Sequence, residues 1–413
     1  MTRHVAAFLA AALPLGALAG CGSARAQKIH TVRGAVAQVT PADPRPFARA
    51  DTVLGLNLMN AWCRKDPRAN VVLSPSSVAS GLGMVHLGAR GATAEAMART
   101  LALPAGDPLP GLRARSRAMK EINGGDVTLH TTDQVWSDKQ SPPGKDYLDR
   151  VATAYDAGLN MLDVQGDPDG ARRTVNEAVE KSTKGQIRDL LPEGAVTKDL
   201  GWILTDAVYL KARWESEFKR SGTGRTPFTT ADARTVQAAT MSRSGLYGLA
   251  RVPGWTAVDM PYRGGRLSMT ALLPDKAAAC PRVEAATLGR LTGALKPARV
   301  DLTVPKVKLR SRADLKDLLT GLGMGVAFSG DADLTGISPK AARLAFVQHA
   351  ASLIMDERGT EAAAATGAGV GATSAAPARA VKVVFDRPYL LLVRDTRTGE
   401  PLFLAAVADP SRS

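Results

Sequence analysis

One stretch near the C-terminus, RGTEAAAATGAGVGATSAAPAR (residues 358–379), limits most strongly what this chain can fold into, because its side chains are nearly all small. Counted in steps of two from Thr360, one set of positions holds only small residues with a β-carbon, and the other set holds Glu361 and the glycines. A strand points alternate side chains to opposite faces. The stretch is therefore typical of a latent strand that buries one face in a tight space.

A flexible Ala/Gly linker is the alternative for this stretch. A linker joins two domains, however, and the roughly 35 residues that follow are too few for a domain but enough for strands of the preceding body. The chain has 413 residues, of which 45% are hydrophobic, and it is patterned without repeat or further linker from Phe47 onward. We therefore expect a single domain over residues 46–410.

The N-terminus has the features of a secretory signal peptide over residues 1–20. Arg3 and His4 precede an apolar run without charge over residues 5–18. The following LAGC resembles a bacterial lipobox, which implies cleavage before Cys21, lipidation of its thiol and attachment to a membrane on the extracytoplasmic side. Cleavage after Ala26, giving a soluble extracellular protein, is the alternative. Residues 21–45, closed by the proline-rich TPADPRP, are expected to form a tether.

Two further cysteines, Cys63 and Cys280, remain in the mature chain. A disulfide between them is compatible with an oxidising compartment, but we expect two unpaired, partly buried thiols. The formal net charge is +14. Such a surface suits anionic polymers or lipid head groups, and a soluble surface with some excess arginine is the alternative.

Periodicity predicts a mixed α and β chain in which helices come first and strands dominate later. This order excludes a simple alternating βαβ sheet. The predicted helices span residues 47–64, 76–101 and 313–322, and residues 172–191 are predicted to form a helix followed by a turn at TKG. The predicted strands span residues 202–210, 267–273, 300–309, 381–385, 389–394 and 401–407.

Signatures of catalysis are missing or weak. The chain contains no G-x-S-x-G and no phosphate-binding G-x-x-x-x-G-K-[ST], and its five histidines show no metal-ligand spacing. GAGVGA matches a dinucleotide fingerprint, but Pro377 would end the helix that must follow it. We expect no enzyme activity, catalytic residue, metal, cofactor or nucleic-acid partner. A surface hydrolase, which would need a nucleophile, is the enzyme alternative.

Several segments, taken in order, resemble the serpins. Essentially all of residues 47–410 are covered, and seven segments in the family's order make the resemblance specific. The similar segments are NVVLSPSSVASGLGMVHLGARGATAEAM, VNEAVEKSTKGQIRDLLP, LTDAVYLKARWESEF, MPYRGGRLSMTALLPD, DLKDLLTGLGMGVAFSGDADLTGIS, MDERGTEAAAATG and FDRPYLLLVRDTRTGEPLFLAAVADP. The resemblance implies a large, mostly antiparallel central sheet, smaller sheets, about eight to nine helices and an exposed reactive loop over about residues 357–380.

What the resemblance implies functionally is a monomeric suicide inhibitor of a serine protease, or of a cysteine protease. The protease attacks the loop and forms an acyl-enzyme, and the cut loop then inserts into the central sheet as a strand and deforms the protease. Small side chains in the stretch fit this role, because an entering strand must fit a packed core. A non-inhibitory serpin that acts as a binding or carrier protein, or a structural lipoprotein, is the alternative.

The resemblance also assigns residues within the loop. Counting about fifteen residues from Gly359 places the reactive bond at Thr373–Ser374, whereas counting back from the next strand places it near Pro377. Small residues here imply an elastase- or subtilisin-like target, and Arg379 would suit a trypsin-like protease. The implied hinge comprises Glu357, Gly359, Thr360, Glu361, Ala362, Ala363, Ala364 and Ala365.

A sheet-opening cluster is implied at Ser74, Ser77, Asp206 and His349. The family usually has Asn where this chain has Asp206, and a carboxylate only accepts hydrogen bonds. We hypothesise that Asp206 makes a charge-assisted bond with His349 and alters how readily the sheet opens. Trp214 matches a tryptophan of the family at the top of the sheet, with an expected role in packing.

Three cations lie at helical spacing in LRARSRAMK, namely Arg113, Arg117 and Lys120. Heparin-activated serpins use a comparable helix to bind polyanions. A solvated basic face is the alternative interpretation.

Overall fold

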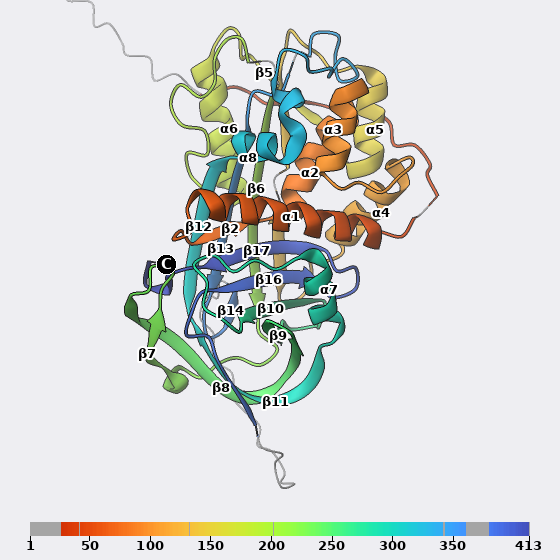
Figure 1. The fold of residues 1–413 in the computed structure, drawn as a ribbon. Coiled ribbons are helices and arrows are strands. Elements are labelled where there is room, and N and C mark those ends of the chain that lie inside the picture. Colours follow the sequence, from red (N-terminus) through yellow and green to blue (C-terminus); the bar gives the residue numbers. More distant parts are fainter. Residues whose placement is uncertain are drawn as a thin grey trace, which may run out of the picture.

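Figure 1 shows the computed structural model, which describes residues 26–40, 42–131, 133–200, 202–341, 343–360 and 380–412. Its helices are α1 (Arg45–Lys65), α2 (Pro75–His86), α3 (Gly91–Thr100), α4 (Leu109–Lys120), α5 (Lys145–Tyr155), α6 (Pro168–Ser182), α7 (Ala285–Gly293) and α8 (Lys316–Leu319). Its strands are β1 (His30–Val32), β2 (Val71–Leu73), β3 (Val127–Thr131), β4 (Gln134–Asp138), β5 (Leu159–Leu162), β6 (Trp202–Arg213), β7 (Thr223–Thr229), β8 (Thr235–Val252), β9 (Trp255–Pro261), β10 (Leu267–Pro274), β11 (Lys296–Pro305), β12 (Val307–Asp314), β13 (Val347–Met355), β14 (Gly359–Thr360), β15 (Val381–Val384), β16 (Tyr389–Asp395) and β17 (Pro401–Val407).

Two sheets form the framework. The first has the order β1-β5-β4-β6-β13-β12, and β3 and β14 also pair with β6. Its pairs are antiparallel except β4 with β5 and β6 with β13, so the sheet is mostly antiparallel, as predicted. The second has the order β15-β11-β8-β9-β10-β16-β17-β2, with β7 on β8. In Figure 1 the strands of the second sheet lie in the lower half, and most helices lie in the upper half.

Helix α2 is deeply buried and packs against β6 of the first sheet. Small residues permit this, since the β-carbon of an alanine at Gly81 would lie 2.8 Å from the Leu204 side chain of β6. Ser74 is the N-cap, and its hydroxyl accepts from the backbone N–H of Ser77. The cap therefore fixes the helix N-terminus beneath the centre of the first sheet.

Three predicted elements differ from the observed ones. The predicted helix over 76–101 is two helices, because the chain turns after His86 and Gly88 lies against Ile337. The predicted strand over 300–309 is two strands that belong to different sheets and are separated by Lys306. The helix predicted over 313–322 starts later, because β12 continues to Asp314.

Much of the expected tether lies on the protein surface. Strand β1 pairs with β5 at the edge of the first sheet. The Gln27 side chain donates to the backbone oxygens of Asp163 and Asp167, and the Ala35 amide donates to Asp149. Edge pairing and hydrogen bonds therefore hold residues of the 26–40 part of the expected tether on the body.

The expectation of two unpaired thiols is wrong. Cys63 in α1 and Cys280, in the loop before α7, form a disulfide with Cα atoms 5.9 Å apart. The spacing of 217 residues gave no indication of this, because proximity arises only when α7 packs near α1. Separately, no helix among the described residues has the length and apolar character needed to cross a membrane.

Candidate functional site: the seam between β6 and β13

The central feature of the first sheet is a parallel pair, β6 and β13, whose common boundary we call the seam. Leu204–Tyr209 pair with Val347–Ser352 in register. The chain leaves β13 at Met355, turns, and returns as β14 beside the far end of β6. There Gly359 pairs with Arg213 and Thr360 pairs with Ala212, antiparallel to β6. The first hinge residues therefore already occupy strand positions at one end of the seam.

Gly359 has to be glycine in this position. Its φ is +148°, and a β-carbon would lie 2.1 Å from the Ala212 backbone oxygen. Its amide and that of Arg358 donate to one carboxylate oxygen of Asp356. Thr360 is 1% exposed, and its hydroxyl lies 2.6 Å from the Tyr262 hydroxyl. The turn and the first buried strand residue are thus fixed on both sides.

Glu357 anchors the outside of the turn. Its carboxylate accepts from Lys306 Nζ at 2.9 Å and from Thr223 Oγ1 at 2.8 Å. Burial opposes ionisation, but the hydrogen bonds and the charge of Lys306 hold the pKa of Glu357 below its usual range. Its backbone oxygen also accepts from the amide of Phe218. These contacts therefore fix the position of the turn at which the hinge begins.

Trp214 closes the same end of the sheet. Its ring stacks on Tyr262 with centroids 4.5 Å apart, and its indole N–H donates to the Asp356 backbone oxygen at 2.9 Å. The packing role expected for Trp214 is therefore accompanied by a hydrogen bond to the turn.

The residues of the predicted sheet-opening cluster meet halfway along the seam. Asp206 and His349 are register partners across it, and His349 Nδ1 lies 3.0 Å from Asp206 Oδ2. The Ser74 amide donates to His349 Nε2 at 3.3 Å. Because Nε2 accepts, the network assigns the proton to Nδ1, which donates to Asp206. Ser77 Oγ donates to the other oxygen of Asp206. The contact hypothesised from the sequence is therefore present.

The sequence analysis missed a second carboxylate in this cluster. Asp133, between β3 and β4, also lies within hydrogen-bond distance of Ser77 Oγ. A serine has one hydroxyl hydrogen and cannot donate to both Asp133 and Asp206 at once. Burial and the charge of Asp206 raise the pKa of Asp133 well above its usual range. A protonated Asp133 donates to Ser77, which leaves the Ser77 hydrogen for Asp206.

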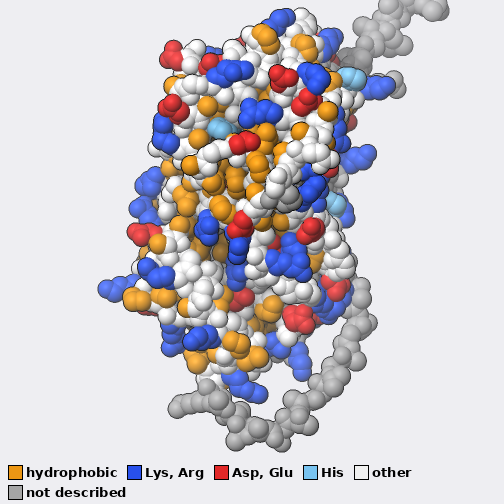
Figure 2. Space-filling model, turned by 90° about the vertical axis from the view of Figure 1, so that its right-hand side faces the viewer, with side chains coloured by type: hydrophobic (Ala, Val, Ile, Leu, Met, Phe, Trp, Pro, Cys, Tyr) orange, Lys and Arg blue, Asp and Glu red, His pale blue; other side chains and the backbone are white. Residues whose placement is uncertain are grey.

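The basic face expected on α4 is partly neutralised. Lys120 forms an ion pair with Asp156, and Arg113 donates to the backbone oxygens of Ala37 and Thr153. Arg117 is exposed. Figure 2 shows Lys and Arg side chains spread over this side of the molecule with Asp and Glu among them, rather than gathered in one patch. The geometry therefore gives little support to a dedicated polyanion face.

Several predicted site residues lie outside the described residues. They are the proposed lipidation site Cys21, the reactive bond Thr373–Ser374, Arg379, and the hinge residues Glu361, Ala362, Ala363, Ala364 and Ala365. Within the described part of the chain, no group of three or more His, Cys, Asp or Glu residues is placed to hold a metal ion.

Comparison with known proteins agrees with this architecture. The chain matches the family model described as Serpin (serine protease inhibitor) over residues 49–410. Leukocyte elastase inhibitor from Bos taurus is 30% identical over 377 residues, which cover 88% of this chain and 99% of the relative.

Two solved structures are similar in fold. The thermophilic serpin tengpin in its native state has a TM-score of 0.81 at 22% identity, covering 92% of this chain and 97% of tengpin. Human thyroxine-binding globulin has a TM-score of 0.78 at 23% identity, and the match covers 89% of this chain and 100% of the globulin. The family match and the bovine relative show that the chain belongs to the serpin family. The two sheets, the seam and a hinge that begins as strand β14 agree with this.

Proposed function

We propose that this protein inhibits a serine protease as a suicide substrate. The observation that carries the proposal is β14, because Gly359 and Thr360 already pair with β6 at the end of the seam. The residues that continue β14 are small, and those on the face of Thr360 carry no charge as far as Ala372. A strand with these side chains can extend along the seam without burying a charge.

In the proposed reaction the protease serine Oγ attacks the carbonyl carbon of Thr373. The Thr373–Ser374 amide bond breaks, the Ser374 amine takes up a proton and leaves, and Thr373 stays bound to the protease as an ester. Loop insertion then separates the ester from the water that would hydrolyse it. Small residues at the bond favour an elastase- or subtilisin-like protease, which agrees with the name of the bovine relative.

The location of this inhibitor is part of the proposal. LAGC at the end of the apolar N-terminal run supports cleavage before Cys21 and a lipid anchor on the extracytoplasmic side. Mass spectrometry of the N-terminal peptide from cell membranes tests this. Diacylglycerol on Cys21 is the expected result, and an unmodified peptide that starts at Gln27 would overturn it.

The proposed inhibition is tested with the mature protein and elastase, subtilisin or trypsin at near-equal molar ratios. We expect an adduct near the summed mass that survives boiling in detergent, and a released peptide that starts at Ser374. Cleavage without an adduct for every protease would overturn inhibition. It would favour a carrier, the function that the name of thyroxine-binding globulin indicates for that protein.

A pair of variants isolates the insertion step. Ala364 falls on the same face as Thr360 by alternation, whereas Ala363 falls on the opposite face. Ala364→Glu should be cleaved at the same bond but should give at least ten times less adduct, because its carboxylate would enter the core. Ala363→Glu carries the same charge and should still give adduct. Equal adduct from both variants would contradict insertion along the seam.

A further inference from the structure

A cavity of about 480 Å³ lies at the closed end of the seam, opposite β14. Trp202, the first residue of β6, and Phe346, just before β13, are among its lining residues and are nearly fully buried. The indole N–H of Trp202 has no hydrogen-bond partner in the described part of the chain. The volume is typical of small-molecule sites, which span roughly 300–1,000 Å³.

The walls of this cavity are strongly cationic. Its lining includes Lys198, Lys316, Lys340 and Arg343, against one carboxylate, that of Asp199. A hydrogen bond from Thr197, together with the charge of Arg343, lowers the pKa of Asp199, so this carboxylate is ionised at neutral pH. Lys340 also donates to the Gln140 backbone oxygen at 3.0 Å. An excess of positive charge remains around a concave surface, which concentrates anions.

We propose that this cavity binds a small multivalent oxyanion, a polyphosphate or a polycarboxylate. Lysine and arginine are the side chains that recognise such groups through charge-assisted hydrogen bonds. The cations come from three separate segments, namely the loop before β6, the start of α8 and the loop before β13. A singly charged anion would contact the cations of only some of these segments, whereas a multivalent anion contacts cations of all three segments at once.

Occupation of the cavity would hold the seam closed, an effect that rests on the proposed function. Lys198 precedes β6 and Arg343 precedes β13, so an anion between them ties the two strands together. Lys316 joins the same assembly, because the neighbouring Leu315 amide donates to the Val347 oxygen at 2.9 Å and Asp314 accepts from the Val347 amide at 3.1 Å. Separation of β6 from β13 would then have to break the contacts of the anion with Lys198 on the β6 side or with Arg343 and Lys316 on the β13 side.

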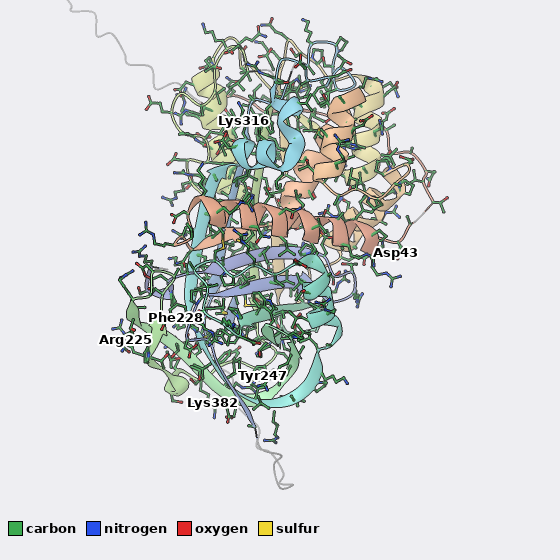
Figure 3. All side chains as sticks on the ribbon, in the orientation of Figure 1. Asp43, Arg225, Phe228, Tyr247, Lys316 and Lys382 are labelled. Carbon is green, nitrogen blue, oxygen red and sulfur yellow. A yellow bond between two sulfur atoms is a disulfide. The ribbon has the colours of Figure 1, made fainter. Side chains whose placement is uncertain are left out.

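Binding is tested by calorimetry of the intact mature protein with tripolyphosphate and, in parallel, with citrate. The pocket variant is Lys198→Gln with Lys316→Gln. The matched control is Lys296→Gln with Lys382→Gln, which removes the same charge, and Lys382 lies at the opposite end of the molecule from Lys316 (Figure 3). We expect affinity to fall at least tenfold in the pocket variant and less than twofold in the control.

Equal losses in the two variants, or binding of neither anion, would overturn the site, and the stronger of the two anions identifies the oxyanion class. The effect on the seam has its own measurement, the rate of adduct formation with and without the bound anion. A several-fold slower rate in the wild type, absent in the pocket variant, is expected. An unchanged rate would overturn the closing role alone. If no protease gives an adduct, the proposed function fails while the calorimetric result stands.

Discussion

At the scale of single residues, Gly359 is the position where the backbone most directly requires one amino acid. The same residue ends the turn after β13 and begins β14, and both tasks exclude a β-carbon. Its neighbours Asp356 and Thr360 complete the turn and the first buried strand position. The identity of this residue therefore decides whether β14 can pair with β6.

Gly359→Ala should release β14 from β6. Positive φ costs a residue with a β-carbon about 1–3 kcal/mol, and the close approach to Ala212 adds to this cost. We expect a lower midpoint in urea unfolding and faster amide exchange at Thr360. The control is Gly399→Ala, where φ is +80° but nothing lies within 4 Å. An equal loss in both variants would mean that backbone strain alone matters and that β14 stays in place.

Asp133→Asn should stabilise the protein at neutral pH. Because the pKa of Asp133 is raised by folding, the native state binds more protons than the unfolded state above about pH 4, and stability falls as pH rises towards the folded pKa. The side-chain amide of asparagine does not ionise in this pH range, so the Asp133→Asn variant does not lose this stability as pH rises. Since Asp133 is only half-buried, we expect a gain of about 1 kcal/mol at pH 7 and none below about pH 4.

Urea unfolding at both pH values measures this, with the exposed Asp331→Asn as control. Lower stability of Asp133→Asn at pH 7 would show that an ionised Asp133 is favourable. Asp206→Asn tests the other carboxylate, because it loses the charge that faces His349. If Asp206→Asn changes neither thermal stability nor the rate of inhibition, the hypothesis about this pair fails.

Residue identities in the cluster were partly predictable. Ser74, Ser77, Asp206 and His349 lie in segments that resemble the family, and the structure brings them together. Asp133 carries no such signal, since an Asp in a polar stretch is ordinary and its position next to Ser77 arises only when β3 and β4 both pair with β6.

At the scale of elements, the segment after α6 is held across the first sheet by β12. Arg310 and Arg312 point to the same side of β12, since they are two residues apart in a strand. Arg310 donates to Gln186, and Arg312 donates to the backbone oxygens of Arg188 and Asp189. These hydrogen bonds therefore fix the segment, residues 183–191, over the seam, and we call this segment the brace.

Arg312→Ala should loosen the brace. We expect a loss of about 1–2 kcal/mol, because two backbone oxygens lose a charged donor, and faster amide exchange in residues 183–191. Lys308→Ala, an exposed cation on the same face of β12, is the control and should change neither quantity. Unchanged exchange in Arg312→Ala would mean that the packing of Ile187 and Leu190 alone fixes the segment.

Strand boundaries show what periodicity could not reveal. Residues 300–309 alternate as one strand, yet Val300 pairs with Gly245 in the second sheet and Leu309 pairs with Leu353 in the first. Alternation reports which face a side chain takes, not which strand lies beside it. Most predicted strands were nevertheless close to the observed ones, because buried apolar runs such as 401–407 have few other ways to satisfy the backbone.

At the scale of the whole molecule, the disulfide closes a loop of more than half the chain. Cys63→Ser with Cys280→Ser should lower the free energy of unfolding by about 2–5 kcal/mol, because the unfolded chain regains the freedom that the long loop removes. Comparison of urea unfolding with and without reductant measures this. Reductant should lower the midpoint of the wild type and leave the double variant unchanged. A wild type insensitive to reductant would contradict the expected contribution.

The docked N-terminal segment has a consequence for orientation. Gln27 is held near α6 at one end of the molecule, whereas β15, where the chain resumes after the loop, lies at the opposite end (Figure 1). If Cys21 is embedded in a lipid bilayer, the protein stands on the membrane with β15 at the end that faces away from it. A strand that lengthens from β14 advances towards β5 and α6, so a captured protease would travel inward, from the bulk solution to the cell surface.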